Sequence, residues 1–247
     1  MNLAAGTTPP GAPDEQQAAK WVRRMFAEIA PRYDLLNHLL SFNIDRGWRN
    51  ALLKQVMPIL LRPEARVLDL CCGTGDVMLA LENVAACTVL GADFCHPMLV
   101  TAEAKTRVQG FPQRLFEADA LELPLAADSL DAITIAFGFR NLVNYRAGLA
   151  EFQRVLKPGG MLAILEFSHP RGALVRNAYG IYSKAILPLI GGFVSGSREA
   201  YSYLPQSVEK FPRAEELIEM FEENGFANAR FELLTGGIAA LHTGEKQ

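Results

Sequence analysis

The chain has 247 residues, of which 50% are hydrophobic, and its 24 basic and 27 acidic residues give a formal net charge of −3. This apolar content excludes disorder over most of the chain, and the balanced charge argues against a protein that wraps nucleic acid. No apolar run approaches the roughly 20 residues of a membrane-spanning helix, and the N-terminus lacks the features of a signal peptide. We therefore expect a cytoplasmic protein with a single domain.

The N-terminal third is predicted to be helical after a short tail. Residues 1–13 are rich in proline, glycine and small side chains, which predicts a disordered tail before one domain over residues 14–247. Apolar residues then recur at helical spacing from Asp14 to Pro31, where the proline ends or bends the helix. Residues 34–50 are predicted to be mostly loop, with a second helix over about 48–61.

From residue 65, short apolar runs alternate with helical stretches. The predicted strands cover residues 65–70, 88–93, 114–118, 130–136 and 161–167. The predicted helices cover residues 76–84, 97–108 and 147–156, the last of them stopped by Pro158-Gly159-Gly160. This alternation is typical of a doubly wound α/β fold, in which a mostly parallel sheet carries helices on both faces.

The C-terminal part departs from this rhythm. Residues 169–208 are too apolar for a linker and too irregular for a sheet element, so we interpret them as a lid or substrate-binding insertion. A last helix is predicted over 212–225, and two closing strands over 231–235 and 238–243 are expected to pair antiparallel. The cysteines have no metal-ligand spacing, so we expect free thiols and no bound metal. They are Cys71, Cys72, Cys87 and Cys95.

The sequence VLDLCCGTGD at residues 67–76 leads from a strand through a glycine-rich turn into a helix. Gly73 and Gly75 permit a tight turn and a close approach of the backbone to a ligand. Met78 stands where the dinucleotide fingerprint needs a small residue, and the lysine of a phosphate-binding loop is absent. Cofactors that contain a pyrophosphate are therefore disfavoured.

Three acidic residues lie at the ends of successive predicted strands, at Asp69, Asp93 and Asp119. Because the carboxyl ends of parallel strands share one edge of a sheet, these carboxylates should face one site, and Asp93 stands where a ribose diol is usually bound. S-adenosylmethionine carries a sulfonium, an ammonium and a ribose diol, and it suits such an edge better than a polyphosphate does. The alternative is a plain turn with solvated acids, which the ordered succession of three acids disfavours.

Further motifs accompany the glycine-rich turn. They are YDLLN at 33–37 with Ser41, Arg46 and Trp48, FGFRN at 137–141, RVLKPGG at 154–160, EFS at 166–168 and AYSYL at 200–204. With residues 69–76 they resemble the UbiE/COQ5 family of quinone-ring C-methyltransferases over about residues 21–246. The resemblance implies the Rossmann-like class I methyltransferase fold, with seven strands, N-terminal helices and a lid insertion. Where that family has glycine near 43 and histidine near 45, this chain has Asn43 and Asp45.

The resemblance also implies that S-adenosylmethionine is the methyl donor and that no metal takes part. Thr74 would lie at the methionine moiety, Asp93 would bind the ribose, and Asp119 with Ala120 would bind the adenine. The full set of cofactor-binding residues implied is Asp69, Gly73, Thr74, Gly75, Asp93, Asp119, Ala120 and Ala136.

The implied reaction transfers a methyl group to a ring carbon of a prenylated quinol. Arg140 is the first catalytic candidate, as a stabiliser of the phenolate, and a salt bridge that holds its turn is the alternative. His169 is a candidate general base or an ordinary loop histidine. The candidate substrate-binding residues are Arg140, Asn141, Tyr201 and Tyr203, and for the last three the alternatives are capping and packing.

For the substrate and the partners, the sequence leaves several alternatives. We expect demethylmenaquinol as the acceptor in menaquinone biosynthesis. The alternatives are the benzoquinol precursor of ubiquinone, both quinols, another small molecule, or a scaffold that binds the cofactor without turnover. No nucleic-acid partner is expected. The apolar segment 179–194 suggests a peripheral contact with the inner face of the cytoplasmic membrane, with an ordinary core helix as the alternative, and a homodimer is left open.

Overall fold

The computed structural model describes residues 6–7, 9, 11–34, 41, 43–172, 180 and 198–247, with the side chains of 198–202 left aside. The first helix, α1 (Glu15–Ile29), begins after Asp14, whose carboxylate accepts a hydrogen bond from the backbone N–H of Gln17 at 2.8 Å. A short 3₁₀ turn that contains Pro31, η1 (Ala30–Arg32), follows it directly. Both the start and the end of this predicted helix are confirmed.

The second helix, α3 (Ile44–Leu60), begins before the predicted position, so the expectation of a loop is wrong over residues 44–47. Its first turns bury Trp48 and contain an ion pair between Arg49 and Asp45, 3.1 Å apart and separated by one helical turn. These contacts outweigh the low helix propensity of the glycine at 47. Asn43, just before the helix, has a φ of 60°, in the left-handed region. Asparagine tolerates that region better than most residues, which accounts for its presence where the family has glycine.

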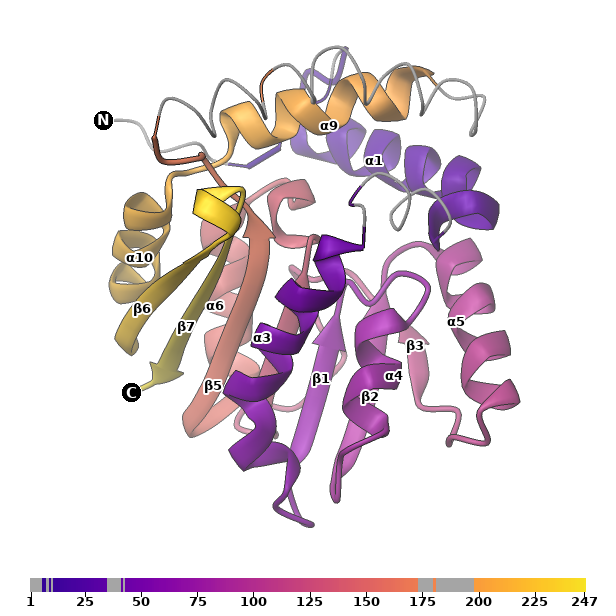
Figure 1. Ribbon diagram of the computed structural model, residues 1–247, viewed down its shortest axis with the longest axis vertical. Coiled ribbons are helices and arrows are strands. Elements are labelled where there is room, and N and C mark those ends of the chain that lie inside the picture. The colour runs from indigo at the N-terminus through magenta and orange to yellow at the C-terminus, as the bar shows by residue number, and fades with distance from the viewer. Residues whose placement is uncertain are drawn as a thin grey trace.

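Within the described residues, seven strands form one sheet in the order β3-β2-β1-β4-β5-β7-β6 (Figure 1). The strands are β1 (Arg66–Leu70), β2 (Thr88–Asp93), β3 (Leu115–Glu117), β4 (Leu130–Ala136), β5 (Leu156–Phe167), β6 (Phe226–Leu234) and β7 (Ala239–Lys246). The first five are parallel, whereas β7 runs antiparallel to both β5 and β6. The predicted doubly wound fold and the antiparallel closing pair are confirmed.

The boundaries around β5 differ from the prediction. Helix α6 (Tyr145–Val155) ends before the proline and glycines at 158–160, and Leu156 already pairs with Leu130 of β4. Those residues lie inside an interrupted strand, because the register jumps from Leu156 to Met161 opposite β4. The two closing strands are also longer than predicted, since β6 begins at Phe226 and β7 continues to Lys246, where these two residues pair with each other.

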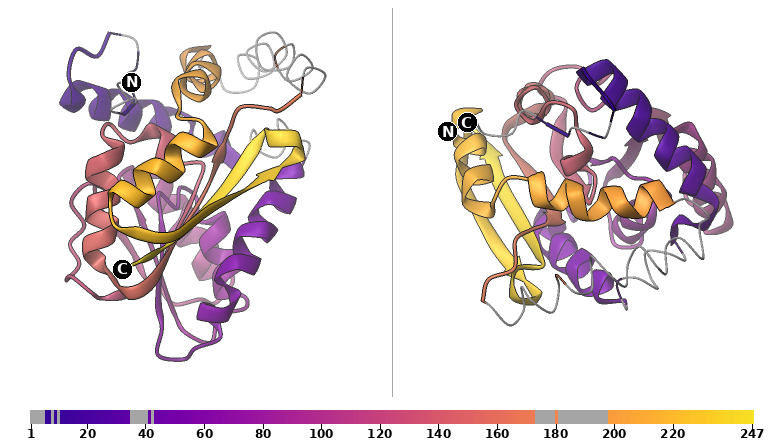
Figure 2. Two further views of the ribbon diagram at one scale, coloured as in Figure 1. Left: turned by 90° about the vertical axis from the view of Figure 1, so that its left-hand side faces the viewer. Right: turned by 90° about the horizontal axis from the view of Figure 1, so that it is seen from above.

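Helices cover both faces of the sheet (Figure 2). On one face, α3 and α4 (Asp76–Glu82) pack against alternate strand residues such as Val67. On the other face, α6 and α10 (Ala214–Glu223) pack against their neighbours, such as Leu68. This division follows from the two-residue repeat of side-chain direction along a strand. Helix α5 (His96–Val108) flanks β2 and β3.

Two helices lie across the carboxyl ends of the strands (Figure 1). They are α1 and α9 (Arg198–Lys210), and the rings of Trp21 and Tyr203 join them at a centroid distance of 5.0 Å. Over the described parts of the chain, no helix has both the length and the apolar character needed to cross a membrane. Apart from Gly180, the predicted apolar segment 179–194 falls outside the described residues.

A buried histidine gives the fold a testable pH dependence. His242 in β7 lies between the rings of Phe221 and Phe231, and burial lowers its pKa from 6.5 to about 4. Between these two values the unfolded chain binds more protons, so this residue makes the folded state less stable as pH falls. From pH 7 to pH 5, the wild type should lose about 2 kcal/mol more unfolding free energy than His242→Phe.

Urea unfolding of both proteins across this pH range measures the difference. The opposite pH dependences of Asp69 and Asp93, whose pKa values are raised by burial, are common to both proteins and cancel. Parallel pH curves for the two proteins would contradict the assignment of a neutral buried imidazole at His242.

Candidate functional site

A pocket with an empty volume of about 740 Å³, open solvent included, lies at the carboxyl edge of the sheet. The loops that follow β1, β2, β3 and β4 form its floor and walls. It lies where the strand order reverses between β1 and β4, which is the usual ligand position in an open α/β sheet. Ala19, Phe26 and Tyr33, from α1 and the residues after it, also line it, so this segment forms a roof.

The glycine-rich turn approaches the pocket through an unusual backbone. Cys71 and Gly73 have φ values of 54° and 55°, and Gly75 has a φ of 85° just before α4 begins. Glycine accepts this left-handed region without strain, whereas Cys71 is held there by its surroundings. Burial raises the pKa of the Cys71 thiol well above its usual value, so this pocket-lining cysteine is no nucleophile.

Asp93 fixes the junction between the first two loops. Its two carboxylate oxygens accept hydrogen bonds from the backbone N–H groups of Gly73 at 2.9 Å and Cys95 at 2.8 Å. Burial raises its pKa to about 6, although these N–H donors act in the opposite direction. Each oxygen keeps a second lone pair, and the residue lines the pocket, so the carboxylate is able to accept hydrogen bonds from a ligand diol.

The eight residues predicted to bind the cofactor divide into two groups. Among the described residues, Gly73, Asp93, Asp119, Ala120 and Ala136 line the pocket, whereas the remaining three do not. These three are Asp69, Thr74 and Gly75.

The residues outside the pocket lining support the turn from behind. Asp69 is buried, accepts a hydrogen bond from the hydroxyl of Thr134 at 2.9 Å, and has a pKa raised by burial to about 7. Thr74 directs its hydroxyl to Asp34 rather than into the pocket. A Cβ at Gly75 would meet the Cβ of Ala102 in α5 at 3.0 Å, so this glycine permits the close approach of α5.

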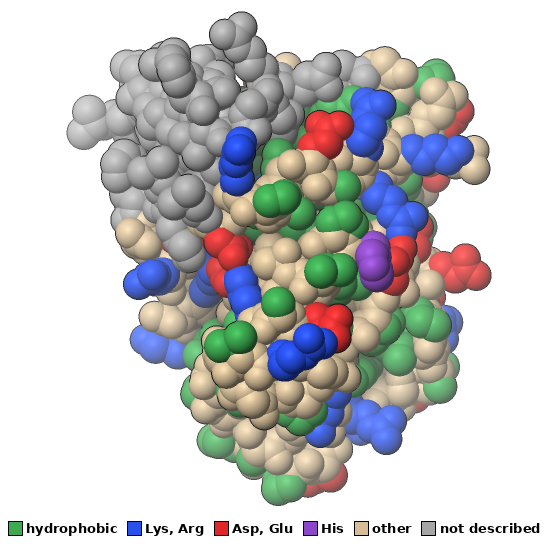
Figure 3. Space-filling model, turned by 90° about the vertical axis from the view of Figure 1, so that its right-hand side faces the viewer, with side chains coloured by type: hydrophobic (Ala, Val, Ile, Leu, Met, Phe, Trp, Pro, Cys, Tyr) green, Lys and Arg blue, Asp and Glu red, His purple; other side chains and the backbone are tan. Residues whose placement is uncertain are grey.

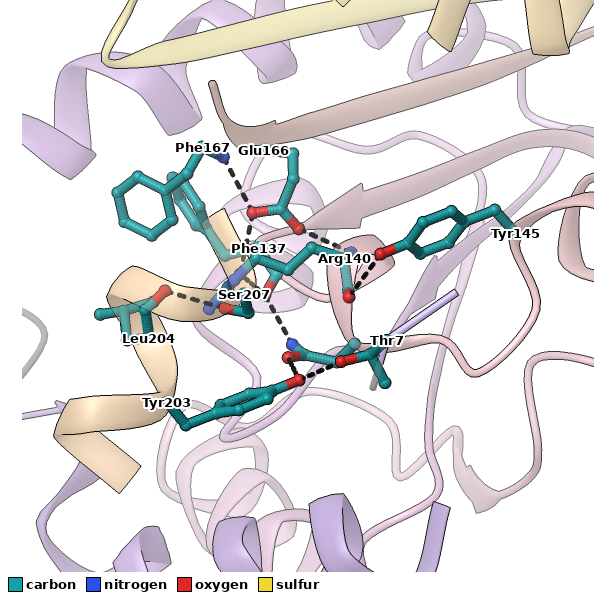
Figure 4. A network of polar contacts seen from close by, with 10 residues as sticks. Thr7, Phe137, Arg140, Tyr145, Glu166, Phe167, Tyr203, Leu204 and Ser207 are labelled. Carbon is teal, nitrogen blue, oxygen red and sulfur yellow. Dashed lines mark hydrogen bonds and ion pairs between the residues drawn. The ribbon is translucent and has the colours of Figure 1, made fainter. Parts of the chain in front are cut away.

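Arg140 lies in the short 3₁₀ helix η2 (Phe139–Asn141), with its guanidinium held on the side of β5 (Figure 4). Nη1 is 2.8 Å from Oε1 of the fully buried Glu166, and it also donates to the carbonyl oxygen of Phe137. The second oxygen of Glu166 accepts the backbone N–H of Arg140 at 3.1 Å. Glu166, which sequence reasoning did not select although it belongs to the EFS motif, therefore neutralises the arginine.

Asn141 is the polar residue of the same turn that lines the pocket. Its Oδ1 accepts the hydroxyl of Tyr203 at 3.1 Å, and Thr7 bonds to the same hydroxyl at 2.6 Å (Figure 4). The backbone N–H of Thr7 also donates to the carbonyl of Leu142 at 2.8 Å. Thr7, which belongs to the segment 1–13 predicted as a tail, is therefore held by long-range contacts that leave no local pattern in the sequence.

An aromatic cluster forms the wall beside this turn. Phe137, which lines the pocket and has a φ of 59°, lies 4.8 Å from Phe167 and 5.9 Å from Trp48 between ring centroids. The indole N–H of Trp48 donates to the hydroxyl of Thr235 at 2.8 Å, which fixes the outermost ring. This side of the pocket therefore offers a rigid aromatic surface to a ligand ring.

The remaining predicted residues lie elsewhere. His169 does not line the pocket in the described structure, and its carbonyl oxygen borders the turn at Gly237. Tyr203 is buried behind Asn141, and the side chain of Tyr201 falls outside the described residues. Where the chain is described, no cluster of potential metal ligands occurs.

The surface on the side of α5 carries basic and acidic side chains next to each other (Figure 3). His96, the first residue of α5, lies close to Glu117 of β3, and Arg23 of α1 lies close to the same carboxylate. Charges of both signs therefore alternate on this face.

The turn at Gly138 is packed too closely for any side chain. A Cβ placed there would lie 2.3 Å from the Cβ of Cys71. Gly138→Ala should lower the free energy of unfolding by about 1–3 kcal/mol, as overpacked positions do, and weaken cofactor binding because Cys71 must move. Gly47→Ala is the control, since nothing lies within 4 Å of its Cβ. It should raise helix stability by about 1 kcal/mol. Equal stabilities of the two variants in urea would contradict the packing argument.

Comparison with known proteins agrees with this geometry. A SAM-dependent methyltransferase from Thermotoga maritima superposes with a TM-score of 0.60 at 20% identity, covering 91% of this chain and 99% of that one. A phosphoethanolamine N-methyltransferase from Haemonchus contortus superposes with a TM-score of 0.61 at 16% identity, covering 81% of this chain and 52% of that one. At such identities the likeness establishes the fold alone.

Proteins found by sequence comparison are more similar to this chain than the structures above are. A protein named demethylmenaquinone methyltransferase from Thermus thermophilus is 48% identical over 90% of this chain and its own whole length. One of the same name from Deinococcus radiodurans is 44% identical over 99% of this chain and all of its own. The profile of the ubiE/COQ5 methyltransferase family matches residues 14–246. The chain therefore belongs to the ubiE/COQ5 methyltransferase family, whose members depend on S-adenosylmethionine.

Proposed function

We propose that this protein transfers the methyl group of S-adenosylmethionine to a ring carbon of demethylmenaquinol, which yields menaquinol. The observation that carries the proposal is the pocket at the reversal of strand order, where Asp93 and the Gly73 backbone meet. The acceptor is taken from the printed names of the relatives in Thermus thermophilus and Deinococcus radiodurans. This chain covers the whole length of both relatives.

The residues of the pocket fit S-adenosylmethionine. Asp93 would accept the ribose hydroxyls, the backbone at Gly73 would approach the methionine part, and Asp119 with Ala120 would bind the adenine. Ala136 would lie beside the reacting end, while Asp69, Thr74 and Gly75 would hold the turn in place. When bound, the cofactor supplies an electrophilic methyl group.

The acceptor ring is assigned to the aromatic side of the pocket. Phe137 would pack against the ring, and Asn141 would hydrogen-bond a ring hydroxyl, since its amide donates only weakly to Phe137, at 3.4 Å. Ionising a phenol-like hydroxyl at pH 7 costs about 4 kcal/mol, so orientation of this group matters for the electron density of the ring. Holding the carbon in line with the methyl group supplies about 7–11 kcal/mol in favourable cases.

The two predicted catalytic side chains receive different assignments. The charge of Arg140 is already balanced by Glu166, so we assign Arg140 to positioning the Phe137–Asn141 turn rather than to direct contact with a phenolate. The position of His169 gives no support to a role as general base. Tyr203 is assigned to orienting Asn141 through its hydroxyl.

The prenyl tail of such a quinol is insoluble in water, so the protein must take its substrate from the membrane. A peripheral contact with the inner membrane surface through segment 179–194 and a homodimer stay predictions of the proposal, because they concern residues and copies that lie outside the described structure. A relative from Syntrophotalea carbinolica, 46% identical over 90% of this chain, is named a ubiquinone/menaquinone biosynthesis C-methyltransferase. This name keeps the benzoquinol precursor of ubiquinone as the second candidate acceptor.

The test uses purified protein with isotope-labelled S-adenosylmethionine and, in separate reactions, reduced demethylmenaquinone and the benzoquinol precursor. Mass spectrometry identifies the products. A methylated naphthoquinol supports the proposal, and a methylated benzoquinol alone would replace the acceptor. If neither is methylated while calorimetry shows cofactor binding, the quinol assignment fails, and another acceptor or a binding scaffold takes its place.

A further inference from the structure

A chain of polar contacts lies beside the glycine-rich turn, behind the residues Tyr33 and Gly73 that line the pocket. The hydroxyl of Thr74 donates to Oδ1 of Asp34 at 2.5 Å, and Nζ of Lys105 lies 2.5 Å from Oδ2 of the same aspartate. Lys105 also lies 2.7 Å from Oδ1 of Asp76, whose Oδ2 accepts from Nη1 of Arg49 at 2.7 Å. One ammonium group therefore joins two carboxylates that belong to different segments of the chain.

These contacts join the roof of the pocket to its floor. Asp34 follows Tyr33, which lines the pocket and lies with its ring Cε1 3.8 Å from the position of a Cβ on Gly73. Thr74 belongs to the turn after β1, Asp76 is the first residue of α4, and Lys105 comes from the last turn of α5. Lys105 is thus the group that connects the roof segment with both the turn and α5.

The surroundings make these contacts stronger than a surface ion pair. The side chains of Lys105, Asp34 and Asp76 are only 26%, 30% and 25% exposed, so water screens their charges less than at an open surface. Burial alone would raise the pKa of Asp76, yet Lys105 and Arg49 hold that pKa below its usual value. The helix does not need Lys105 for its packing, because Met98, Leu99, Ala102 and Thr106 supply the buried face of α5.

We propose that Lys105 is a positioning residue that closes the roof over the methionine end of S-adenosylmethionine. Its ammonium holds Asp34 against Thr74, and this contact keeps Tyr33 over the glycine-rich turn. The proposal rests on the proposed function only for the identity of the ligand. It requires that loss of the ammonium speeds release of the cofactor, while the transfer step of the filled enzyme is little changed.

The decisive variant is Lys105→Met, which keeps the length and apolar stem of the side chain and removes the charge. Its dissociation constant for S-adenosylmethionine and S-adenosylhomocysteine, measured by calorimetry, should rise about tenfold, as expected for one partly buried ion pair. Stopped-flow displacement should assign the change to faster dissociation. Turnover at saturating cofactor should stay within about twofold, the signature of a lost binding interaction.

Matched variants separate this role from a structural one. Lys157→Met removes another 2.7 Å ion pair, with Asp131 at the opposite end of β4, and should leave cofactor affinity unchanged. Asp34→Asn should weaken cofactor binding as much as Lys105→Met does, and the double variant should bind no more weakly than either single variant. Lys105→Arg, which keeps a positive charge, should bind the cofactor with nearly wild-type affinity. Thermal unfolding of each variant shows that it is folded at the temperature of the assay.

Two results would overturn the proposal. One is wild-type affinity and dissociation rate for Lys105→Met. The other is an equal loss of affinity in Lys157→Met, which would indicate a general effect of charge removal. Because these measurements need no quinol, failure of the quinol assignment would leave them intact, and it would be seen separately as missing methylated product.

Discussion

Asp93→Asn should weaken the binding of S-adenosylmethionine by about 100-fold, since hydrogen bonds to a charged group contribute about 1.5–3 kcal/mol each. The carboxylate accepts two backbone N–H groups, from Gly73 and Cys95, and faces the pocket at the position proposed for the ribose. An asparagine amide would turn an N–H donor toward one of these N–H groups, so it disturbs the turn and also loses an acceptor for the diol. Calorimetric titration with S-adenosylmethionine measures the loss.

The same residue predicts how affinity depends on pH. The pKa of Asp93 is raised by burial to about 6, and the carboxylate form is the one that accepts both backbone N–H groups and still offers a lone pair on each oxygen to the proposed ribose diol. Cofactor affinity should therefore be constant above this pKa and fall as pH decreases through about 6. Asp93→Asn should lack this decrease, because its amide does not titrate.

Asp128→Asn provides the control. Asp128 lies on the surface with a φ of 53°, a conformation that asparagine tolerates, and it pairs with Lys246 at 2.6 Å away from the pocket. The affinity of Asp128→Asn for S-adenosylmethionine, and the dependence of that affinity on pH, should match those of the wild type. Cofactor binding by Asp93→Asn at wild-type strength would contradict the assignment of this carboxylate to the ribose.

Arg140→Met should lower the free energy of unfolding by about 3–5 kcal/mol, as removal of one partner from a buried ion pair does. The substitution leaves the fully buried carboxylate of Glu166 without its cation, 2.8 Å from the lost nitrogen. It also removes the donor to the carbonyl of Phe137, so the turn that carries Asn141 should lose order. Equilibrium unfolding in urea measures the effect.

Two further variants show whether the buried charge is the cause. The double variant Arg140→Met with Glu166→Gln should be more stable than Arg140→Met alone, because a neutral amide needs no counter-ion. Arg146→Met removes an ion pair with Glu223 in which both side chains are about half exposed, and it should change stability by less than about 1 kcal/mol. A loss of activity in Arg140→Met without any loss of stability would instead restore Arg140 as a direct catalytic group.

The sheet could be predicted from the sequence because its determinants are local. Apolar runs of four to seven residues such as 88–93 and 130–136 coincide with β2 and β4, and the glycines after β1 mark the turn that approaches the ligand. Boundaries were wrong where tertiary pairing outweighs local preference. Leu156 joins the strand because Leu130 is available as a partner, although proline and glycine follow within the next four residues.

The supporting contacts of the site could not be predicted in the same way. Arg140 pairs with Glu166 across 26 positions of sequence, and Thr7 meets Tyr203 across 196. Such pairs depend on how loops from different strands come together at one edge of the sheet. A periodic pattern of apolar residues contains no information on these long-range contacts. The sequence therefore indicates which residues gather at the edge but not which of them face the ligand.

The two outermost strands determine how the sheet behaves when molecules meet. At one side, β3 has only the three residues Leu115–Glu117, too short to pair with a strand of another molecule. At the other side, β6 shifts register between Ala227 and Arg230 and bears charged side chains, which disfavours a further strand. Both are devices by which proteins prevent sheets from joining edge to edge. A dimer of this enzyme would thus form through helices or loops, and the sheet is protected from growth into aggregates.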